Sequence, residues 1–513
     1  MAYDIAVPTN PPRKQSRLDL WLILLLAAVL RFWALDIKAP HFDEGINGWF
    51  ADRLREQGSF VYDPTNYHGP WHFYSLFLSQ SLLGRSIWAL RLPVIIASLL
   101  CIPALFLFAR WFGRSAVRWA ALAFAVSPAC VFYGRYSIHE PWFVLFCMLF
   151  TWGAIALWLD RDKAGLWAAA AGLTGMILNK ETYIIHAGSL ALAAGVFALW
   201  NRVSPLNPPA ERAATRGWQS KDGWMAAGVM TFLLVFFYSG NFFNLRGLLG
   251  PFEALFAWTQ TGVAAHGHDK PAYEILPLIN YYWVALLARY EWPALAGLVW
   301  SVRYAWPGPA VPRLLSIYAG GILLAYSIVP YKTPWCIISI LWPWFLFFGA
   351  AIDAGKKTWV RAAGILLLAV SLGMALRLNF REYENDTEPY VYVQTYNSLR
   401  TLTDPLLDAA ERDPRFYRVN GALCSDYYPL PWILGDFTNL AWHGKPDPAN
   451  DKKLPASFKG CDFVLVETKD ATVVRGKLPP DFVERRFKFR SGMEECTVFF
   501  SPRIISRRWE DAP

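Results

Sequence analysis

The sequence is poor in charged residues. Of its 513 residues, 17% are Asp, Glu, Lys or Arg, whereas 55% are hydrophobic. In a soluble globular protein, about a quarter of the residues carry charge. This shortage of charge excludes an ordinary soluble domain and indicates a protein embedded in membrane lipid.

The hydrophobic residues form runs that are long enough to cross a bilayer, which takes about 20 residues of helix. These runs lie at 18–35, 86–109, 117–133, 141–159, 164–178, 183–200, 224–243, 276–302, 314–329, 335–352 and 361–376. They predict a polytopic α-helical protein with about eleven transmembrane helices. The run 276–302 is interrupted by Arg289 and Glu291, and Pro277 and Pro293 could split or kink its helix.

The net charge of +9 is spread along the chain rather than gathered in one patch. Lys and Arg residues precede the first run and recur in alternate loops, as the positive-inside rule requires of cytoplasmic segments. We therefore attribute the charge to anchoring beside anionic lipid and expect no nucleic acid as a partner. We expect an integral protein of the inner (cytoplasmic) membrane with a cytoplasmic N-terminus. No small-residue cleavage site follows the first run, which predicts an uncleaved anchor.

The composition becomes polar near residue 377. Short β-rich runs at 462–467 and 496–500 alternate there with Pro and Gly turns. We expect a transmembrane domain at 1–376, with a long first outer loop at 37–85, and an extracytoplasmic α/β domain at 377–513. Three cysteines, Cys424, Cys461 and Cys496, lie in this second domain. An oxidising compartment would allow one disulfide and one free thiol among them, and the sequence does not choose the pair.

Two adjacent acids, Asp43 and Glu44, follow the first hydrophobic run. Adjacent side chains on a helix or strand do not point the same way, so we expect one carboxylate to act as a base while the other orients it. The structural alternative is that Asp43 caps a helix and Glu44 lies beside its positive end. The amphipathic stretches 45–57 and 71–83 predict two short helices in the membrane interface.

Charged and polar groups at the outer ends of the predicted spans are further candidates. A charge at membrane depth costs about 2.5–3.5 kcal/mol on insertion scales, so these groups should face a polar cavity or one another, or else snorkel to the interface. Converging cations would suit a phosphate headgroup, with Arg135 binding bidentately and Lys180 and Lys332 acting as point charges. The candidate donor-binding residues are His68, Arg135, His139, Glu140, Lys180, Glu181, Tyr331 and Lys332.

Two histidines in another outer segment, His266 and His268, lie near Asp269 and Lys270. They could form a metal or phosphate site, although their spacing is not a recognised zinc pattern. No cofactor is certain from the sequence, and a divalent metal stays open.

Together these features resemble the GT-C class of membrane glycosyltransferases, especially the protein mannosyltransferase and lipid A aminoarabinose transferase group. The resemblance depends on Asp43 and Glu44 in the first outer loop, the two interfacial helices and the Trp88-Ala-Leu-Arg-Leu-Pro93 start of the second span. It covers the membrane portion more than the tail. It implies a polyprenyl-phosphate-linked sugar as donor, Asp43 as the base, inversion at the anomeric carbon, and a glycan, lipid or protein acceptor that the sequence does not identify.

The stretches Lys180-Glu181-Thr182 and Tyr331-Lys-Thr-Pro-Trp335 are similar to a bacterial and archaeal family described as associated with lipid-linked oligosaccharide flippase activity. This similarity supplies the alternative function, movement of lipid-linked sugars without bond cleavage. A flippase would be expected to carry polar residues through the middle of several spans, whereas most candidates here gather at outer ends, which favours a transferase. No DxD motif lies in the first outer loop, which argues against a metal-dependent oligosaccharyltransferase mechanism.

Overall fold

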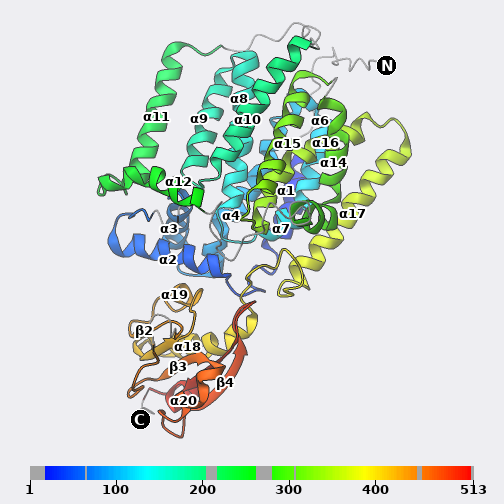
Figure 1. Cartoon of the computed structure of the whole chain (residues 1–513). Coiled ribbons are helices and arrows are strands. Elements are labelled where there is room, and N and C mark those ends of the chain that lie inside the picture. Colours follow the sequence, from blue (N-terminus) through cyan, green and yellow to red (C-terminus); the bar gives the residue numbers. More distant parts are fainter. Residues whose placement is uncertain are drawn as a thin grey trace.

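The chain forms a helical bundle with a smaller α/β domain beneath it (Figure 1). The computed structural model describes residues 18–63, 66, 68–203, 217–260, 280–305, 308–446 and 453–509. The α-helices of the bundle are α1 (Leu18–Phe32), α4 (Ile87–Phe106), α5 (Ala109–Phe112), α6 (Arg114–Val126), α7 (Pro128–Tyr133), α8 (Glu140–Asp160), α9 (Lys163–Ile177), α10 (Tyr183–Val203), α11 (Ser220–Tyr238), α12 (Gly250–Gln260), α14 (Trp292–Ala305), α15 (Ala310–Ile328), α16 (Ile337–Ala354) and α17 (Thr358–Phe380).

Every hydrophobic run of the sequence contains helix, which confirms the predicted α-helical membrane fold. Within the described residues, six segments are long and apolar enough to cross a membrane by themselves. They are Ile87–Phe112, Glu140–Asp160, Tyr183–Arg202, Ala310–Ile328, Pro334–Ala354 and Thr358–Phe380. Some of the other runs are divided. The run 117–133, for example, is split where Ser127 caps α7 ahead of Pro128. The count of about eleven spans stays a prediction.

The predicted span 276–302 is broken near Pro293. A π-helical segment, Asn280–Ala288, ends before α14 begins at Trp292. The carboxylate of Glu291 lies buried in the break, where it accepts hydrogen bonds from Ser127 Oγ at 2.7 Å and from the Ala129 amide at 2.8 Å. Both donors lie at the start of α7, where a helix leaves amides unpaired and favours negative charge. This charge is therefore held inside the protein and away from lipid.

Two short helices, α2 (Phe42–Gln57) and α3 (Trp71–Leu83), lie across the lower end of the bundle (Figure 1). Their positions agree with the predicted interfacial helices. The N-cap of α2 is His41 rather than Asp43, because His41 Nδ1 accepts the Asp43 amide and Glu44 closes a capping box on the His41 amide. The helix ends at Gly58, whose φ of 70° suits glycine.

The α/β domain is built on a mixed five-stranded sheet of order β2-β1-β3-β5-β4. Its strands are β1 (Gly421–Cys424), β2 (Leu440–Trp442), β3 (Phe463–Glu467), β4 (Val483–Lys488) and β5 (Glu495–Phe500). Strands β2 and β3 pair with β1 in parallel, whereas β5 pairs with β3 and β4 antiparallel. The helices of the domain are α18 (Arg400–Arg412), α19 (Leu430–Ile433), α20 (Ala471–Arg475) and α21 (Pro502–Ser506). The predicted α/β class is confirmed, and the two predicted β-rich runs become β3 and β5.

The disulfide that the sequence allows does not form. All seven cysteines lie within the described residues, and each is a free thiol. Cys424 packs on one face of the sheet with Val464 and Phe499, whereas Cys496 packs on the other face with Leu465 and Val498. The sheet therefore separates these two thiols.

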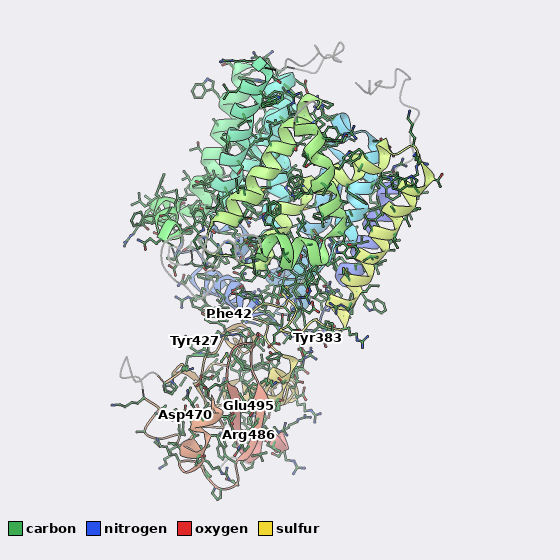
Figure 2. The ribbon with its side chains drawn as sticks, turned by 45° about the vertical axis from the view of Figure 1, so that its right-hand side comes forward. Phe42, Tyr383, Tyr427, Asp470, Arg486 and Glu495 are labelled. Carbon is green, nitrogen blue, oxygen red and sulfur yellow. The ribbon has the colours of Figure 1, made fainter. Side chains whose placement is uncertain are left out.

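The α/β domain contacts the bundle through α19, which packs against α2. Two glycines of α2 make the contact close. A Cβ atom on Gly45 would overlap Pro429, and one on Gly48 would overlap the indole of Trp432. Phe42, at the start of α2, lies at the level of this contact in Figure 2. The side chain of Arg490 lies over its ring, 4.3 Å from the centroid.

Polar contacts reinforce the same junction. Arg85, between α3 and α4, forms an ion pair with Asp52 of α2 at 2.9 Å and another with Asp436 of the α/β domain at 3.4 Å. It also donates a hydrogen bond to the Trp432 carbonyl. The predicted domain boundary at 376 falls inside α17, which continues to Phe380, and Tyr383 lies just below the bundle (Figure 2). The two domains therefore meet along α2.

We expect Gly48→Ala to weaken this junction. The added methyl group must displace the Trp432 indole, and such overpacking typically costs about 1–3 kcal/mol. The measurement is the thermal unfolding temperature of the detergent-purified protein, which should fall. Gly188→Ala in α10 is the matched control, because a Cβ there meets nothing within 4 Å and should leave the unfolding temperature unchanged or slightly raised. Equal unfolding temperatures for the two variants would contradict the close packing of α19 on α2.

Candidate active site

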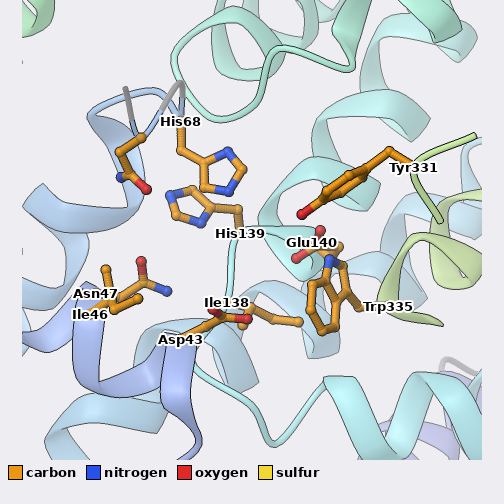
Figure 3. A pocket seen from close by; sticks show the side chains of 10 residues that line it. Asp43, Ile46, Asn47, His68, Ile138, His139, Glu140, Tyr331 and Trp335 are labelled. Atoms are coloured by element: carbon orange, nitrogen blue, oxygen red, sulfur yellow. The ribbon is translucent and has the colours of Figure 1, made fainter. Parts of the chain in front are cut away.

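A polar cavity of about 160 Å³ lies between α2, the start of α8 and the segment that follows α15 (Figure 3). It is lined by Asp43, Ile46, Asn47, Asn66, His68, Ile138, His139, Glu140, Tyr331 and Trp335. The structure thus brings together five predicted site residues, Asp43, His68, His139, Glu140 and Tyr331. They come from segments far apart in the sequence, so the cavity is a product of the tertiary fold.

Asp43 presents its carboxylate to the cavity (Figure 3). It lies in the first turn of α2, and its side chain is 31% exposed. Its neighbour His41 is buried and places Nε2 2.9 Å from the Tyr392 carbonyl, so this nitrogen carries the proton and Nδ1 accepts the Asp43 amide. Burial lowers the pKa of His41, which keeps its ring neutral. Asp43 is therefore a solvated carboxylate on a fixed backbone, free of a cationic partner at His41.

Glu44 points the other way. Its side chain is fully buried, and Arg91 of α4 binds both carboxylate oxygens, with Nε donating at 2.8 Å and Nη2 at 2.7 Å. The amides of His41 and Ser137 donate to the same oxygens at 2.8 and 2.9 Å. Burial alone would raise the pKa of Glu44, but the Arg91 charge and these hydrogen bonds lower it to about 2. The ionised Glu44 ties α2 to α4 and is not among the residues that line the cavity, so of the two predicted roles it suits the orienting one.

An ion pair and a histidine–carboxylate contact lie at or behind the cavity wall. Lys180, just after α9, pairs with Glu140 at the start of α8, and both side chains are almost completely buried. His68 Nδ1 lies 2.9 Å from a Glu181 oxygen, and the His68 side chain is partly exposed. Lys180 and Glu181 do not line the cavity themselves, but each contacts a residue that does.

Three imidazole rings follow one another beside the cavity. The ring of His139 lies 4.4 Å from that of His68 and 4.7 Å from that of His72, measured between centroids. Burial lowers the pKa of His72 to about 3 and holds the pKa of His139 well below its usual value. Both rings are therefore neutral near pH 7 and can exchange hydrogen bonds without adding charge.

Two of the predicted cations lie elsewhere. Arg135 donates to the carbonyls of Leu30, Trp33 and Ala34 at 3.0, 2.6 and 2.7 Å, so its guanidinium satisfies carbonyls left unpaired where α1 ends. The expected bidentate contact of Arg135 with a phosphate is not supported by this placement. Lys332 is buried and donates to the Val329 carbonyl at 2.6 Å, and it does not line the cavity.

The predicted metal candidates His266 and His268 lie outside the described residues. Within the part of the chain that the structure describes, no group of three or more His, Cys, Asp or Glu side chains could hold a metal ion.

Several residues that line the cavity were not predicted from the sequence. Asn47, whose amide nitrogen donates to the Ser137 carbonyl at 2.9 Å, lies four residues after Asp43 and hence on the same side of α2. Trp335 closes the Tyr331–Trp335 stretch, and its ring lies 6.3 Å from that of His41. The sequence also contained a signal for the structural role of Arg91. An arginine inside the hydrophobic run 86–109 is costly unless it is paired.

The chain is an integral membrane protein with the fold of the GT-C class of membrane glycosyltransferases, as the sequence predicts. It aligns with the crystal structure of ArnT from Cupriavidus metallidurans bound to undecaprenyl phosphate with a TM-score of 0.62 at 16% identity, over 96% of this chain and 99% of that chain. The apo state of the same ArnT aligns with a TM-score of 0.62 at 15% identity, over 97% and 100% of the two chains. Residues 67–210 match the family model of dolichyl-phosphate-mannose-protein mannosyltransferases. No curated protein sequence matches the chain.

We expect Arg91→Met to destabilise the protein strongly, because it leaves the Glu44 carboxylate buried without a counter-charge. Breaking a buried pair in this way typically costs about 3–5 kcal/mol. The double variant Glu44→Gln with Arg91→Met removes both charges and should recover part of the loss. The measurement is the thermal unfolding temperature in detergent at pH 7, and a single variant as stable as the wild type would contradict the structural role of the pair.

The pH dependence of stability gives a second test of the same pair. Because the folded pKa of Glu44 is about 2 against an ordinary value of 4.5, the pair contributes its full stability above about pH 5. This contribution is lost as the pH falls from about 4.5 towards 2, through the folded pKa. The double variant should therefore show a shallower loss of unfolding temperature over this range than the wild type, and equal slopes would contradict the lowered pKa.

Proposed function

We propose that this protein transfers a sugar from a polyprenyl-phosphate-linked donor to an acceptor, with Asp43 as the general base. The observation that carries this proposal is the placement of Asp43, a partly exposed carboxylate directed into a polar cavity lined by His68, His139, Glu140 and Tyr331. The GT-C fold supports it, and ArnT, which shares the fold, has a structure bound to undecaprenyl phosphate.

In the proposed reaction, an oxygen of the acceptor attacks the anomeric carbon of the donor sugar. The bond from that carbon to the phosphate oxygen breaks, and the phosphate leaves with the electron pair. Asp43 takes the proton of the attacking hydroxyl, for which it must lie within hydrogen-bond reach of that oxygen. Attack from the side opposite the leaving phosphate inverts the anomeric centre. The fixed backbone at the start of α2 orients the carboxylate for this step.

The donor phosphate is proposed to lie between Tyr331 and Glu140 on one side of the cavity and His68 on the other. Figure 3 shows Tyr331 and Trp335 on one side of the cavity and His68 and Asn47 on the other. The Tyr331 hydroxyl can donate a hydrogen bond to a phosphate oxygen, and so can Nε2 of a protonated His68 ring, whose Nδ1 faces Glu181. Lys180 neutralises the Glu140 carboxylate, which would otherwise repel the phosphate. Such donors would stabilise the charge that develops on the leaving phosphate. Arg135 has no part in this proposal, because it caps α1.

The acceptor is proposed to react at the extracytoplasmic face of the inner membrane. Support comes from the bundle, in which α1 starts at the end far from the α/β domain, while α2 and the cavity lie at the near end (Figure 1). A cytoplasmic N-terminus, as the positive-inside rule predicts, would put the cavity outside. Among the described residues, the polar candidates gather at this one end, which gives no support to a flippase.

We expect Asp43→Asn to lower sugar transfer by about 10²–10⁴-fold, because the amide keeps the shape of the side chain but accepts no proton. Transfer is measured with protein in lipid nanodiscs and a panel of undecaprenyl-phosphate hexoses, by following both the glycosidic bond and the free undecaprenyl phosphate. Asp36→Asn, an exposed residue just beyond α1, is the matched control and should transfer normally. An Asp43→Asn protein that binds donor and transfers at the wild-type rate would reject the base, and movement of intact donor without bond cleavage would favour a flippase.

We expect His68→Ala to weaken binding of undecaprenyl phosphate by about tenfold, the worth of one charge-assisted hydrogen bond. Binding is measured by titration of the protein in nanodiscs with this lipid. His443→Ala, which changes an exposed histidine of the α/β domain, serves as the control. An unchanged dissociation constant for His68→Ala would remove His68 from the donor site.

A further inference from the structure

A second cavity, of about 320 Å³, lies further along α2. Its size is at the lower end of the range of about 300–1,000 Å³ that is usual for ligand pockets. Its lining combines aromatic and polar side chains, among them Trp49, Phe50, Arg53, Gln57, Tyr62 and Asp63. We call this cavity the distal groove. None of its lining residues has a part in the chemistry proposed at Asp43.

The distal groove follows the same face of α2 as the catalytic cavity. Ile46 and Asn47 line the first cavity with Asp43, and Phe50, Arg53 and Gln57 line the groove. These positions follow Asp43 by 3, 4, 7, 10 and 14 residues, the spacing of one helix face.

Described residues beyond the end of α2 line both cavities. Residues 60–63 line the groove, and Asn66 and His68 line the catalytic cavity. The two cavities therefore lie one after the other along α2.

A buried hydroxyl in the groove lacks a partner. Tyr62 is 7% exposed, and among the described residues its hydroxyl has no hydrogen-bond partner. Its ring is fixed by contact with Tyr238, at 5.0 Å between centroids. Burying a hydroxyl without a partner costs free energy, so such groups are normally satisfied by the fold, by water or by a ligand. Because Tyr62 also lines the groove, a molecule bound there could supply the missing partner.

The other lining groups suit a sugar. Trp49 offers a partly exposed indole, and the guanidinium of Arg53 lies over it, 5.4 Å from the ring centroid. An aromatic face can cover the apolar C–H face of a pyranose ring, while Arg53, Gln57 and the Tyr62 hydroxyl can bond its hydroxyl groups. An acyl chain would leave these polar groups desolvated and unpaired, which disfavours lipid as the occupant.

We propose that the distal groove binds a saccharide, and that the acceptor is a glycan of at least two sugar rings. This proposal rests on the proposed function, since it places the reacting ring at Asp43 and the following rings against Trp49. The separation requires more than one ring, because the six residues from Asp43 to Trp49 rise by about 9 Å along the helix, which is longer than a single pyranose.

The test is binding of the full-length protein in nanodiscs to an array of mono- to hexasaccharides. The wild type should bind at least one saccharide of two or more rings. Trp49→Ala should weaken this binding by about tenfold or more, since truncated tryptophans dominate many binding sites. Trp359→Ala is the matched control, because Trp359 is exposed at the start of α17, at the far end of the bundle, and should bind normally.

Tyr62→Phe separates a ligand role from a structural one. It removes only the unpartnered hydroxyl, so the unfolding temperature should be unchanged or higher, while saccharide binding should weaken by about threefold to tenfold. A lower unfolding temperature with unchanged binding would overturn the proposal. So would an array on which the wild type binds no saccharide, or binding that Trp49→Ala leaves intact, or a wild type that binds only peptides.

The binding assay is independent of catalysis. Asp43→Asn should retain the saccharide contacts made in the distal groove, because Asp43 is not among the residues that line the groove. If Asp43→Asn still transfers sugar while Trp49→Ala loses binding, the assignment of Asp43 as the base is wrong and saccharide binding in the distal groove is supported. If transfer depends on Asp43 but the acceptor KM is the same in Trp49→Ala and the wild type, acceptor binding in the distal groove is rejected and the proposed function is supported.

Discussion

The buried ion pair between Glu44 and Arg91 is the interaction on which the site depends. Burial of two charges is expensive and is offset only when their hydrogen bonds are complete. Here Arg91 and the amides of His41 and Ser137 supply four bonds to one carboxylate, and Arg91 also donates to the Leu35 carbonyl. The pair fixes the rotation of α2 about its axis. Asp43 is thereby turned away from Arg91 and towards the cavity. Two identical functional groups, adjacent in sequence, thus receive different surroundings.

Helix α2 joins the parts of the protein that matter for the proposed reaction. Its first turn carries Asp43, its length lines both cavities, and its glycines admit α19 of the α/β domain. The neutral ring of His41 links this first turn to the Tyr392 carbonyl in the segment after α17. Any shift of the α/β domain would therefore reach the backbone that holds Asp43. The domain therefore supports the site structurally, in addition to forming a fold of its own.

Much of the fold and part of the site could be predicted because they depend on local patterns. Hydrophobic runs of bilayer length gave the bundle, and alternation and turn residues gave β3 and β5. Polar groups at span ends gave His139 and Glu140 as candidates, and the polar and aromatic mix in the first outer loop gave His68. Arg135 shows the limit of this reasoning. A cation at a span end can meet a ligand or cap a neighbouring helix, and only the position of α1 beside it decides between them.

The sequence by itself determined a charge-poor α-helical membrane protein, its interfacial helices, its α/β tail and the acid pair that opens α2, because these follow from composition and periodicity along the chain. The tertiary structure alone decided which acid faces the cavity and which is held by Arg91. It also decided that Lys180 stands behind Glu140 and that two cavities share one face of α2. These relations join residues far apart in sequence, and burial and partner geometry exist only once the helices have packed.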